Sequence, residues 1–425
     1  MSTKSASFIN DLTEGSVAKK LLYFAFPFML SNLLQTVYNL VDMSVVGHFM
    51  GSAGLSAVST GGRLVELLTF VCTGFCTGGQ ILLSQQVGAK KHSEMQKTIG
   101  TLFSFTMLSA IVLGILSIVF HNDLLRLLNT PESAFQEAAS YMVICNSGCI
   151  FIFGYNALCS ILRGMGDSKR PLVFVAIASV VNLILDLIFV AGFGMGAAGA
   201  AIATVLGNVF ADCYYLFVIV TKSQRLSASI REIHISRTMA RDIFTIGIPA
   251  SITNLMQSFM VMMTNHFLLA YGTDKIAAMG IALKANMITA LILVGFAFGG
   301  QPLIGYNYGS RNQKRLKEIL KFAYLLEMGL GLVFTILMSV FAPAIIGIFM
   351  KDPDIMANGA AMLRCQQLGM VFMSVTLVSA CVCQSVGNAL GAFLLSVCRQ
   401  GVLYAAFLFL LSNLFGYHGV LLSQA

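Results

Sequence analysis

The sequence predicts an all-α polytopic membrane protein made of two related halves. Of its 425 residues, 57% are hydrophobic and 10% are charged, whereas soluble proteins carry about 25% charged residues. The apolar residues form blocks at least about 20 long, the length with which an α-helix crosses a bilayer. A motif in the first block recurs 222 residues later, which predicts an internal duplication.

Eleven apolar blocks, separated by polar or glycine-containing breaks, define the predicted spans. Each can cross about 30 Å of hydrocarbon at about 1.5 Å per residue. A twelfth helix is expected to begin near Gly419 and to be largely absent, because the sequence ends at Ala425. The eleven spans are 18–46, 55–86, 97–120, 138–161, 171–191, 198–221, 242–270, 276–306, 318–348, 358–384 and 392–414.

The distribution of basic residues predicts the orientation of these spans. Nineteen of the 26 Lys and Arg residues lie in one alternating set of loops, whereas the opposite loops hold Arg126, Lys275 and Lys351. Loops rich in Lys and Arg stay on the cytoplasmic side. We therefore expect a multi-pass protein of the cell membrane with a cytoplasmic N-terminus. The net charge of +8 follows from this asymmetry and from anionic lipid, and gives no reason to expect a nucleic acid partner.

Two motifs recur at nearly one offset. The stretch Pro27–Gln35 recurs as Pro249–Gln257 with the same proline, asparagine, leucine and glutamine, and Gly78-Gly79-Gln80 recurs as Gly299-Gly300-Gln301. Six spans separate the copies, so both halves keep one orientation and the pseudo-two-fold axis follows the membrane normal. The repeat predicts an N-terminal lobe at 1–221, a cytoplasmic linker at 222–241 and a C-terminal lobe at 242–425.

Pro27 and Pro249 both lie inside a predicted helix, at the start of each half. Proline removes one backbone hydrogen bond and bends a helix. We therefore predict a hinge in the first helix of each half.

Four polar residues inside the spans form the candidate functional site, because such residues are costly at membrane depth. Asp42, Asn182, Asp186 and Thr204 come from the first, fifth and sixth spans. Counting about 1.5 Å per residue places Asp42, Asp186 and Thr204 roughly 8 to 9 Å below the outer surface, and Asn182 lies one turn from Asp186 on the same helix face. Two carboxylates, an amide and a hydroxyl could bind a sodium ion or protons. The alternative is a structural network of hydrogen bonds between helices.

The remaining acids within the spans, Glu66, Asp212 and Glu327, have no assigned role. Glu66 lies one helical turn from Arg63 and can pair with it. Asp212 and Glu327 have no evident partner in the sequence.

Several stretches resemble the multidrug and toxic compound extrusion (MATE) family over essentially the whole chain. The most specific are Gln35–Asp42, Asn156–Asp167, and Asn182–Asp186 followed by Gly199–Thr204; Gln384–Gly387 and Arg399-Gln400 resemble the subgroup of Gram-positive bacteria. The resemblance implies two six-helix lobes in a V around a central cavity. It implies efflux of amphipathic, often cationic drugs and dyes in exchange for protons or sodium, and it places the cation site on Asp42, Asn182, Asp186 and Thr204.

The chain departs from the family at two second-half positions. One branch of the family carries a coupling glutamate in the seventh helix, where this chain has Gln257, and the repeat partner of Asp42 is Thr264. Both residues are neutral, so we expect cation coupling in the first lobe alone. The predicted substrate cavity comprises Gln35, Asn39, Asn156, Gln257 and Met260.

Two other functions remain as alternatives to a drug antiporter. A flippase for lipid-linked sugars, from the same superfamily, would use a cationic cavity that Arg63, Lys284, Arg364 and Arg399 could supply. An intramembrane enzyme would need a motif such as His-Glu-x-x-His or Gly-x-Ser-x-Gly, and neither is present. The prediction is a monomeric alternating-access antiporter in the lipid bilayer, not an enzyme, with small organic cations as substrates, H⁺ or Na⁺ as coupling ion and no cofactor.

Overall fold

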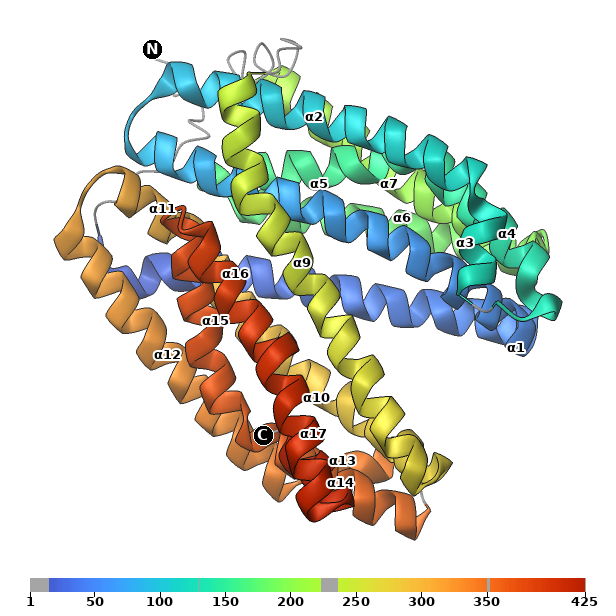
Figure 1. Cartoon of the computed structure of the whole chain (residues 1–425). Coiled ribbons are helices and arrows are strands. Elements are labelled where there is room, and N and C mark those ends of the chain that lie inside the picture. Colours follow the sequence, from blue (N-terminus) through green and yellow to red (C-terminus); the bar gives the residue numbers. More distant parts are fainter. Residues whose placement is uncertain (1–14, 129, 223–235, 350–351, 425) are drawn as a thin grey trace. The chain divides into compact units, whose positions relative to one another are not determined.

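A computed structural model of the chain describes residues 15–128, 130–222, 236–349 and 352–424, and these ranges are almost entirely helical (Figure 1). Within them there is no strand. A helix satisfies its backbone hydrogen bonds within one segment, which lipid requires because it offers no partners. The predicted all-α membrane class is confirmed.

The first long helix, α1 (Val17–Gly88), contains two spans joined at a kink. Gly51 makes the kink with φ 67° and ψ −161°, a conformation that a residue with a Cβ rarely adopts. The other helices of the first half are α2 (His92–Val119), α3 (His121–Leu127), α4 (Glu132–Ser147), α5 (Cys149–Gly164), α6 (Lys169–Asp186), the π-helix η1 (Leu187–Gly192) and α7 (Gly196–Lys222).

The second half begins with a similarly long helix, α9 (Arg237–Leu268), which contains Pro249. The helices that follow are η2 (Leu269–Tyr271), α10 (Thr273–Gly299), α11 (Gln301–Gly309), α12 (Gln313–Val340), α13 (Ala342–Phe349), α14 (Pro353–Leu368), α15 (Met370–Ser385), α16 (Ala389–Val397), η3 (Cys398–Val402), α17 (Leu403–Phe415) and α18 (Tyr417–Leu422).

Among the described residues, ten of the eleven predicted spans coincide with helices or bent helix pairs that are long and apolar enough to cross a membrane. Eight continuous helices are long and apolar enough to cross a membrane, and two bent pairs raise the number to ten. The bent pairs are α4 with α5, at 52°, and α14 with α15, at 43°. With 32 residues, α9 is also long enough to cross. The short helix α18 lies where the twelfth span was expected to begin.

The chain divides into two compact units. Unit 1 contains Leu30–Ser251, and unit 2 contains Ile252 onward together with the start of α1 up to Met29. Both α1 and α9 therefore contribute their first turns to one unit and the remainder to the other. The change occurs two residues beyond Pro27 in α1 and two residues beyond Pro249 in α9. The predicted lobe limits at 221 and 242 remain predictions, and most of the linker 222–241 lies outside the described residues.

In unit 1, two glycines of α1 let the start of α9 pack against it closely. A Cβ on Gly78 would lie 2.5 Å from the Ile243 carbonyl oxygen, and one on Gly74 would lie 2.6 Å from the Gly247 carbonyl oxygen. Small residues in this spacing are typical of close helix contacts within membranes. A larger side chain at either glycine would push α9 away.

In unit 2, two glycines of α10 play the same part for the start of α1. A Cβ on Gly295 would lie 2.5 Å from the Met29 Cβ, and one on Gly299 would lie 2.5 Å from the Ala25 Cα. These glycines follow Gly74 and Gly78 by 221 residues. The duplicated glycines therefore hold duplicated helix contacts, one inside each unit.

Candidate functional site

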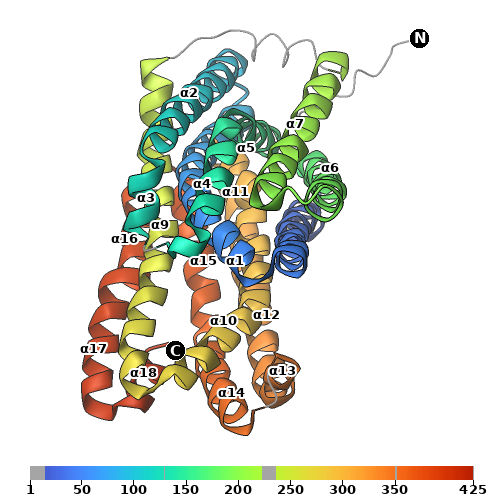
Figure 2. The ribbon, with the colours of Figure 1, turned by 90° about the vertical axis from the view of Figure 1, so that its right-hand side faces the viewer.

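Three helices of unit 1 bring the four predicted coupling residues together. Asp42 lies on α1, Asn182 and Asp186 lie one turn apart on α6, and Thr204 lies on α7. Helices α6 and α7 pack side by side (Figure 2). Gly207 permits this approach, because a Cβ there would lie 2.9 Å from the Ala178 carbonyl oxygen and 3.1 Å from the Asn182 Cβ.

The polar contacts leave several oxygen atoms available inside the protein. The Asn182 Nδ2 donates to the Thr204 Oγ1 at 3.2 Å. The Asn182 Oδ1, both Asp186 carboxylate oxygens and the Asp42 Oδ1 are buried and receive no hydrogen bond of ordinary geometry from the described residues. Asp186 is fully buried, and Asp42 is 8% exposed. The two carboxyl groups lie close enough to interact electrostatically.

Three further residues that the sequence reasoning did not assign to the site surround the Asp42 carboxyl. The Tyr38 hydroxyl interacts with Thr204 and lies near both aspartates. Tyr141 and Cys145, on α4, lie near Asp42. Tyr38 could have been found from its spacing, one helical turn before Asp42. Nothing local in the sequence connects α4 with α1.

The surroundings of this group suit a small cation. Buried carboxylates and carbonyl-type oxygens without partners are the ligands that hard cations prefer. An apolar cluster near the start of α7 contains Val46, Val190 and Ala197, together with Tyr141 and Cys145. Asp186 is directly followed by the π-helix η1, a rare conformation that often occurs at functional sites. The residues present therefore fit either a bound proton or a sodium ion.

The residues predicted to form the substrate cavity belong to both units, and their assignment to one cavity stays a prediction. Gln35 and Asn39 are exposed one turn apart on α1. Asn156 is half-buried on α5, where its Nδ2 donates to the Ile152 carbonyl oxygen of its own helix at 2.8 Å. Met260, on α9, packs against the core of unit 2. The side chain of Gln257 lies outside the described residues.

The three unassigned acids occupy different environments. Glu66 is exposed on α1 and interacts electrostatically with Arg63. Asp212 is buried on α7, where a Cβ on Gly154 would lie 3.1 Å from its Oδ2. Glu327 is 1% exposed on α12 of unit 2 and lines a small cavity.

Unit 2 has a neutral group at the positions that correspond to the aspartate site. An offset of 222 maps Asp42 onto Thr264, and Asp186 has no acidic counterpart at an offset of 221 or 222, where Phe407 and Leu408 stand. The hydroxyls of Thr264 and Tyr404 share a hydrogen bond, and the Gln424 Nε2 donates to both. These groups satisfy one another without a charge. The counterpart of the aspartate pair therefore carries no acid.

Comparisons with known proteins agree with this architecture. The MatE family model matches residues 27–188 and 249–410, so its two copies start at Pro27 and Pro249. "Probable multidrug resistance protein YpnP" of Bacillus subtilis is 30% identical over 96% of this chain and 92% of its own length. "Multidrug export protein MepA" of Staphylococcus haemolyticus is 26% identical over 96% of this chain and 90% of its own length.

Solved structures show the same fold over the full chain. A structure described as an outward-facing multidrug resistance MATE family transporter of the MOP superfamily has a TM-score of 0.91 at 22% identity, covering 100% of this chain and 94% of that one. A MOP superfamily transporter from Pyrococcus furiosus has a TM-score of 0.89 at 23% identity, with the same coverage. Its description reports a binding pocket of reverse polarity and suggests a different function for that protein. The match of the family model to both halves and the full-length relatives lead to one conclusion: the chain belongs to the multidrug and toxic compound extrusion family of membrane transporters.

Proposed function

We propose that the chain is an antiporter that exports amphipathic, often cationic drugs in exchange for protons or sodium ions. The observation that carries this proposal is the buried pair of Asp42 and Asp186, next to Asn182 and Thr204, within unit 1. Relatives that match nearly the full chain bear the names multidrug resistance protein and multidrug export protein, which supports drugs as the substrate class. The proposed location is the cell membrane, with the N-terminus in the cytoplasm.

The chemistry of the pair explains why a cation would be needed. Two negative charges close together away from water repel each other strongly, and desolvation adds to the cost. A proton on one carboxyl removes one charge and lets the protonated oxygen donate to the other carboxylate. Sodium would instead be held by Asp42, Asp186, the Asn182 Oδ1 and the Thr204 hydroxyl, and it would balance the charge without covalent change.

Helix α1 links this site to a hinge. Asp42 lies 15 residues beyond Pro27 on the same helix, and α1 passes from unit 2 to unit 1 just after that proline. A bend at Pro27 would move the part of α1 that carries Asp42 relative to the preceding turns, where Ala25 packs on Gly299. In this proposal cation binding selects one bend, and Pro249 allows the matching change in α9. Alternating access follows from these two hinges.

Drug and cation binding are proposed to compete through α1. Gln35 and Asn39 precede Asp42 on this helix and offer amide groups to a drug. Asn156, Gln257 and Met260 complete the proposed cavity, and the flexible thioether of Met260 suits ligands of varied shape. A drug that holds α1 in one bend would weaken cation binding, and the cation would in turn expel the drug.

Dye efflux from cells tests this proposal. Asp42→Asn and Asp186→Asn keep side-chain size but remove the charge, so we expect either change to abolish net efflux in cells that express normal amounts of the protein. Asp123→Asn, an exposed acid on α3, is the matched control and should retain efflux. Wild-type efflux in both aspartate variants would contradict the coupling role. Failure of the unaltered chain to export any cationic dye would contradict drug export.

A further inference from the structure

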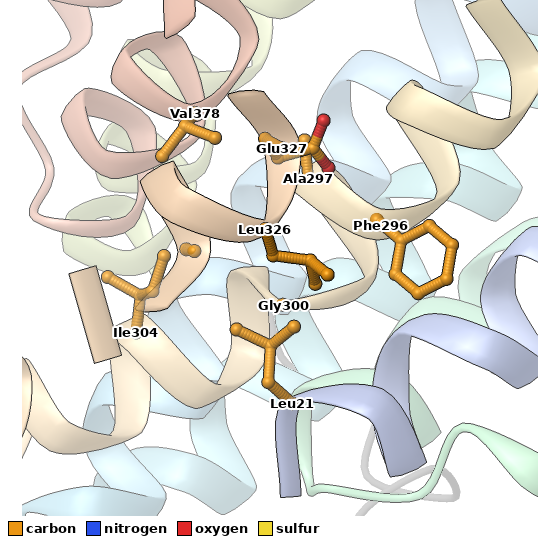
Figure 3. Close-up of a pocket in the computed structure, with 9 residues that line it drawn as sticks. Leu21, Phe296, Ala297, Gly300, Ile304, Leu326, Glu327 and Val378 are labelled. Atoms are coloured by element: carbon orange, nitrogen blue, oxygen red, sulfur yellow. The ribbon is translucent and has the colours of Figure 1, made fainter. Parts of the chain in front are cut away.

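Glu327 is an acid of unit 2 that the proposed aspartate site does not use. It lies on α12 and is one of nine residues around a small cavity inside that unit (Figure 3). Four elements besides α12 contribute to the wall: α1, α10, α11 and α15. The residues that line the cavity with Glu327 are Leu21, Phe296, Ala297, Gly300, Ile304, Ala323, Leu326 and Val378.

The chemistry of this cavity favours a proton over a metal ion. Both Glu327 carboxylate oxygens are buried without a hydrogen bond from the described residues. The cavity has room for about one water molecule. Every other lining side chain is apolar or absent, so no second side-chain oxygen is offered to a sodium ion, which needs several. A proton needs a single carboxylate oxygen.

No charged group of the described residues faces Glu327. The residues that α1, α10 and α11 contribute to the cavity are apolar, and so is Val378 of α15. On a neighbouring helix, the titratable Cys381 of α15 lies close enough to interact electrostatically with Glu327. The Cys381 thiol donates to the Ala297 carbonyl oxygen at 3.2 Å. The charge of Glu327 is therefore not balanced by a basic side chain.

The repeat shows that unit 1 has nothing comparable at this position. An offset of 221 maps Glu327 onto Thr106. Thr106 is fully buried, and its hydroxyl donates to carbonyl oxygens of its own helix, including that of Phe103 at 3.1 Å. The position is thus neutral and satisfied in unit 1, but acidic and unsatisfied in unit 2.

In unit 1, the residue before Thr106 belongs to a cluster of three aromatic rings. Phe75, Phe105 and Phe244 pack edge to face, with ring centroids 4.7 to 5.1 Å apart. At the offset of 221, Phe105 corresponds to Leu326 of the cavity wall. A smaller residue where unit 1 has a ring contributes to the open space beside the acid.

The first turns of α1 form part of the cavity wall. Leu21 lines it, and a Cβ on Gly300 would lie 3.6 Å from the Leu21 Cδ1. One turn further along α1, Ala25 meets Gly299 of α10. The cavity therefore borders the helix segment that precedes Pro27.

We propose that Glu327 is a second proton-binding site, located in the unit that lacks the aspartates, and that its protonation state alters how residues 17–29 of α1 pack on α10. An ionised carboxylate in an apolar cavity favours water entry and loosens the wall, whereas the neutral acid lets Leu21 close over it. Proton binding at Glu327 does not depend on the proposed coupling at Asp42 and Asp186. Its effect on transport does rest on that proposal.

Infrared difference spectroscopy during a pH titration of the purified full chain tests the proton site. We expect a titrating carboxyl band that is lost in Glu327→Gln and in Glu327→Thr, the residue that unit 1 carries there. Glu318→Gln is the matched control, because Glu318 is exposed on the same helix. The band should persist in Asp42→Asn, so it is independent of the aspartate site. Identical titrations of the unaltered chain and Glu327→Gln would overturn the proposal. If the neutral variants do not fold, Glu327→Asp replaces them, and its carboxyl band should be shifted from that of the unaltered chain.

Hydrogen exchange of residues 17–29, compared between variants at one pH, tests the effect on α1. At a pH where the unaltered chain has lost the Glu327 band, Glu327→Gln should slow exchange in this segment, and Glu318→Gln should not. Equal exchange in the unaltered chain and Glu327→Gln would overturn the link to α1. The comparison is repeated with Glu327→Gln introduced into the Asp42→Asn variant, which is expected to be inactive in efflux. Slower exchange there would show that the effect on α1 does not require the proposed antiport.

Discussion

Asn182 and Thr204 orient one another beside the aspartate pair. The Asn182 amide nitrogen donates a hydrogen bond to the Thr204 hydroxyl. The Asn182 amide oxygen, like the Asp186 carboxylate oxygens, is buried and has no hydrogen-bond partner among the described residues. Tyr38 adds a second hydroxyl at the same place. The site is therefore a group of oxygen atoms in which one hydrogen bond, between Asn182 and Thr204, sets the orientation of the Asn182 amide.

Thr204→Val removes that contact while it keeps the shape of the side chain. The Asn182 Nδ2 then loses its acceptor, and we expect the protein to lose about 1 kcal/mol of stability together with most coupled efflux. Thr204→Ser retains the hydroxyl and should retain both. Thermal unfolding in detergent and dye efflux measure the two effects. Normal efflux in Thr204→Val would show that the hydroxyl has no part in the site.

The four polar residues of the site could be predicted from the sequence, but their neighbours could not. Depth along each helix could be counted from the sequence, so Asp42, Asp186 and Thr204 could be grouped at one level. The sequence does not show which residues of α4 face this group, because that depends on the rotation and packing of α4. Tyr141 and Cys145 therefore appear only in the tertiary structure.

At the scale of helices, the duplicated glycines explain how α1 and α9 are held. Gly295 and Gly299 receive the start of α1 within unit 2, and Gly74 and Gly78 receive the start of α9 within unit 1. The contacts are close because no Cβ intervenes, and dispersion between the touching backbones replaces the hydrophobic effect, which is weak inside lipid. Each contact extends across a proline, because Met29 follows Pro27 and Ser251 follows Pro249 by two residues.

Gly295→Leu should displace the start of α1 from unit 2. Its side chain would overlap Met29, so we expect a loss of about 1 to 3 kcal/mol in stability, with lower efflux. Gly280→Leu, on the same helix, is the control, because Gly280 is exposed and a Cβ there meets nothing within 4 Å. Thermal unfolding in detergent compares the two variants. Equal stability would show that the start of α1 does not depend on Gly295.

The helices themselves were well predicted because their signal is local. Apolar length predicts a span in lipid, and the breaks predicted each connection to within several residues. The bends between α4 and α5 and between α14 and α15 were not predicted. Gly148 and Gly369 stand at these bends, but glycine is frequent throughout the chain and only packing decides which glycine bends a span.

At the scale of the whole molecule, the two halves share a fold but not a chemistry. The aspartate positions of unit 1 become Thr264 and its neutral partners in unit 2, whereas the neutral Thr106 of unit 1 becomes Glu327 in unit 2. Duplication has preserved helix packing, and the acids have diverged. Two distinct ionisable sites in one duplicated transporter would allow each unit to respond to cations separately.

Purified protein in proteoliposomes can identify the coupling ion. Drug movement is measured under a pH gradient alone and under a sodium gradient alone, and we expect one of them to drive uphill exchange. Asp42→Asn and Asp186→Asn should abolish that drive, whereas Asp123→Asn should not. Uphill drug movement with neither gradient, or full drive in both aspartate variants, would contradict cation-coupled antiport through this site.

The sequence by itself determined the membrane class, the spans, the duplication and the candidate acids, because each depends on local composition or on matching letters. The tertiary structure decided which segments belong together. It assigns the start of α1 to unit 2 and the start of α9 to unit 1, places Tyr38 and α4 beside the aspartates, and places Glu327 under α1. These relations join residues far apart in the chain, and their cause is close packing at glycines, which sequence periodicity does not record.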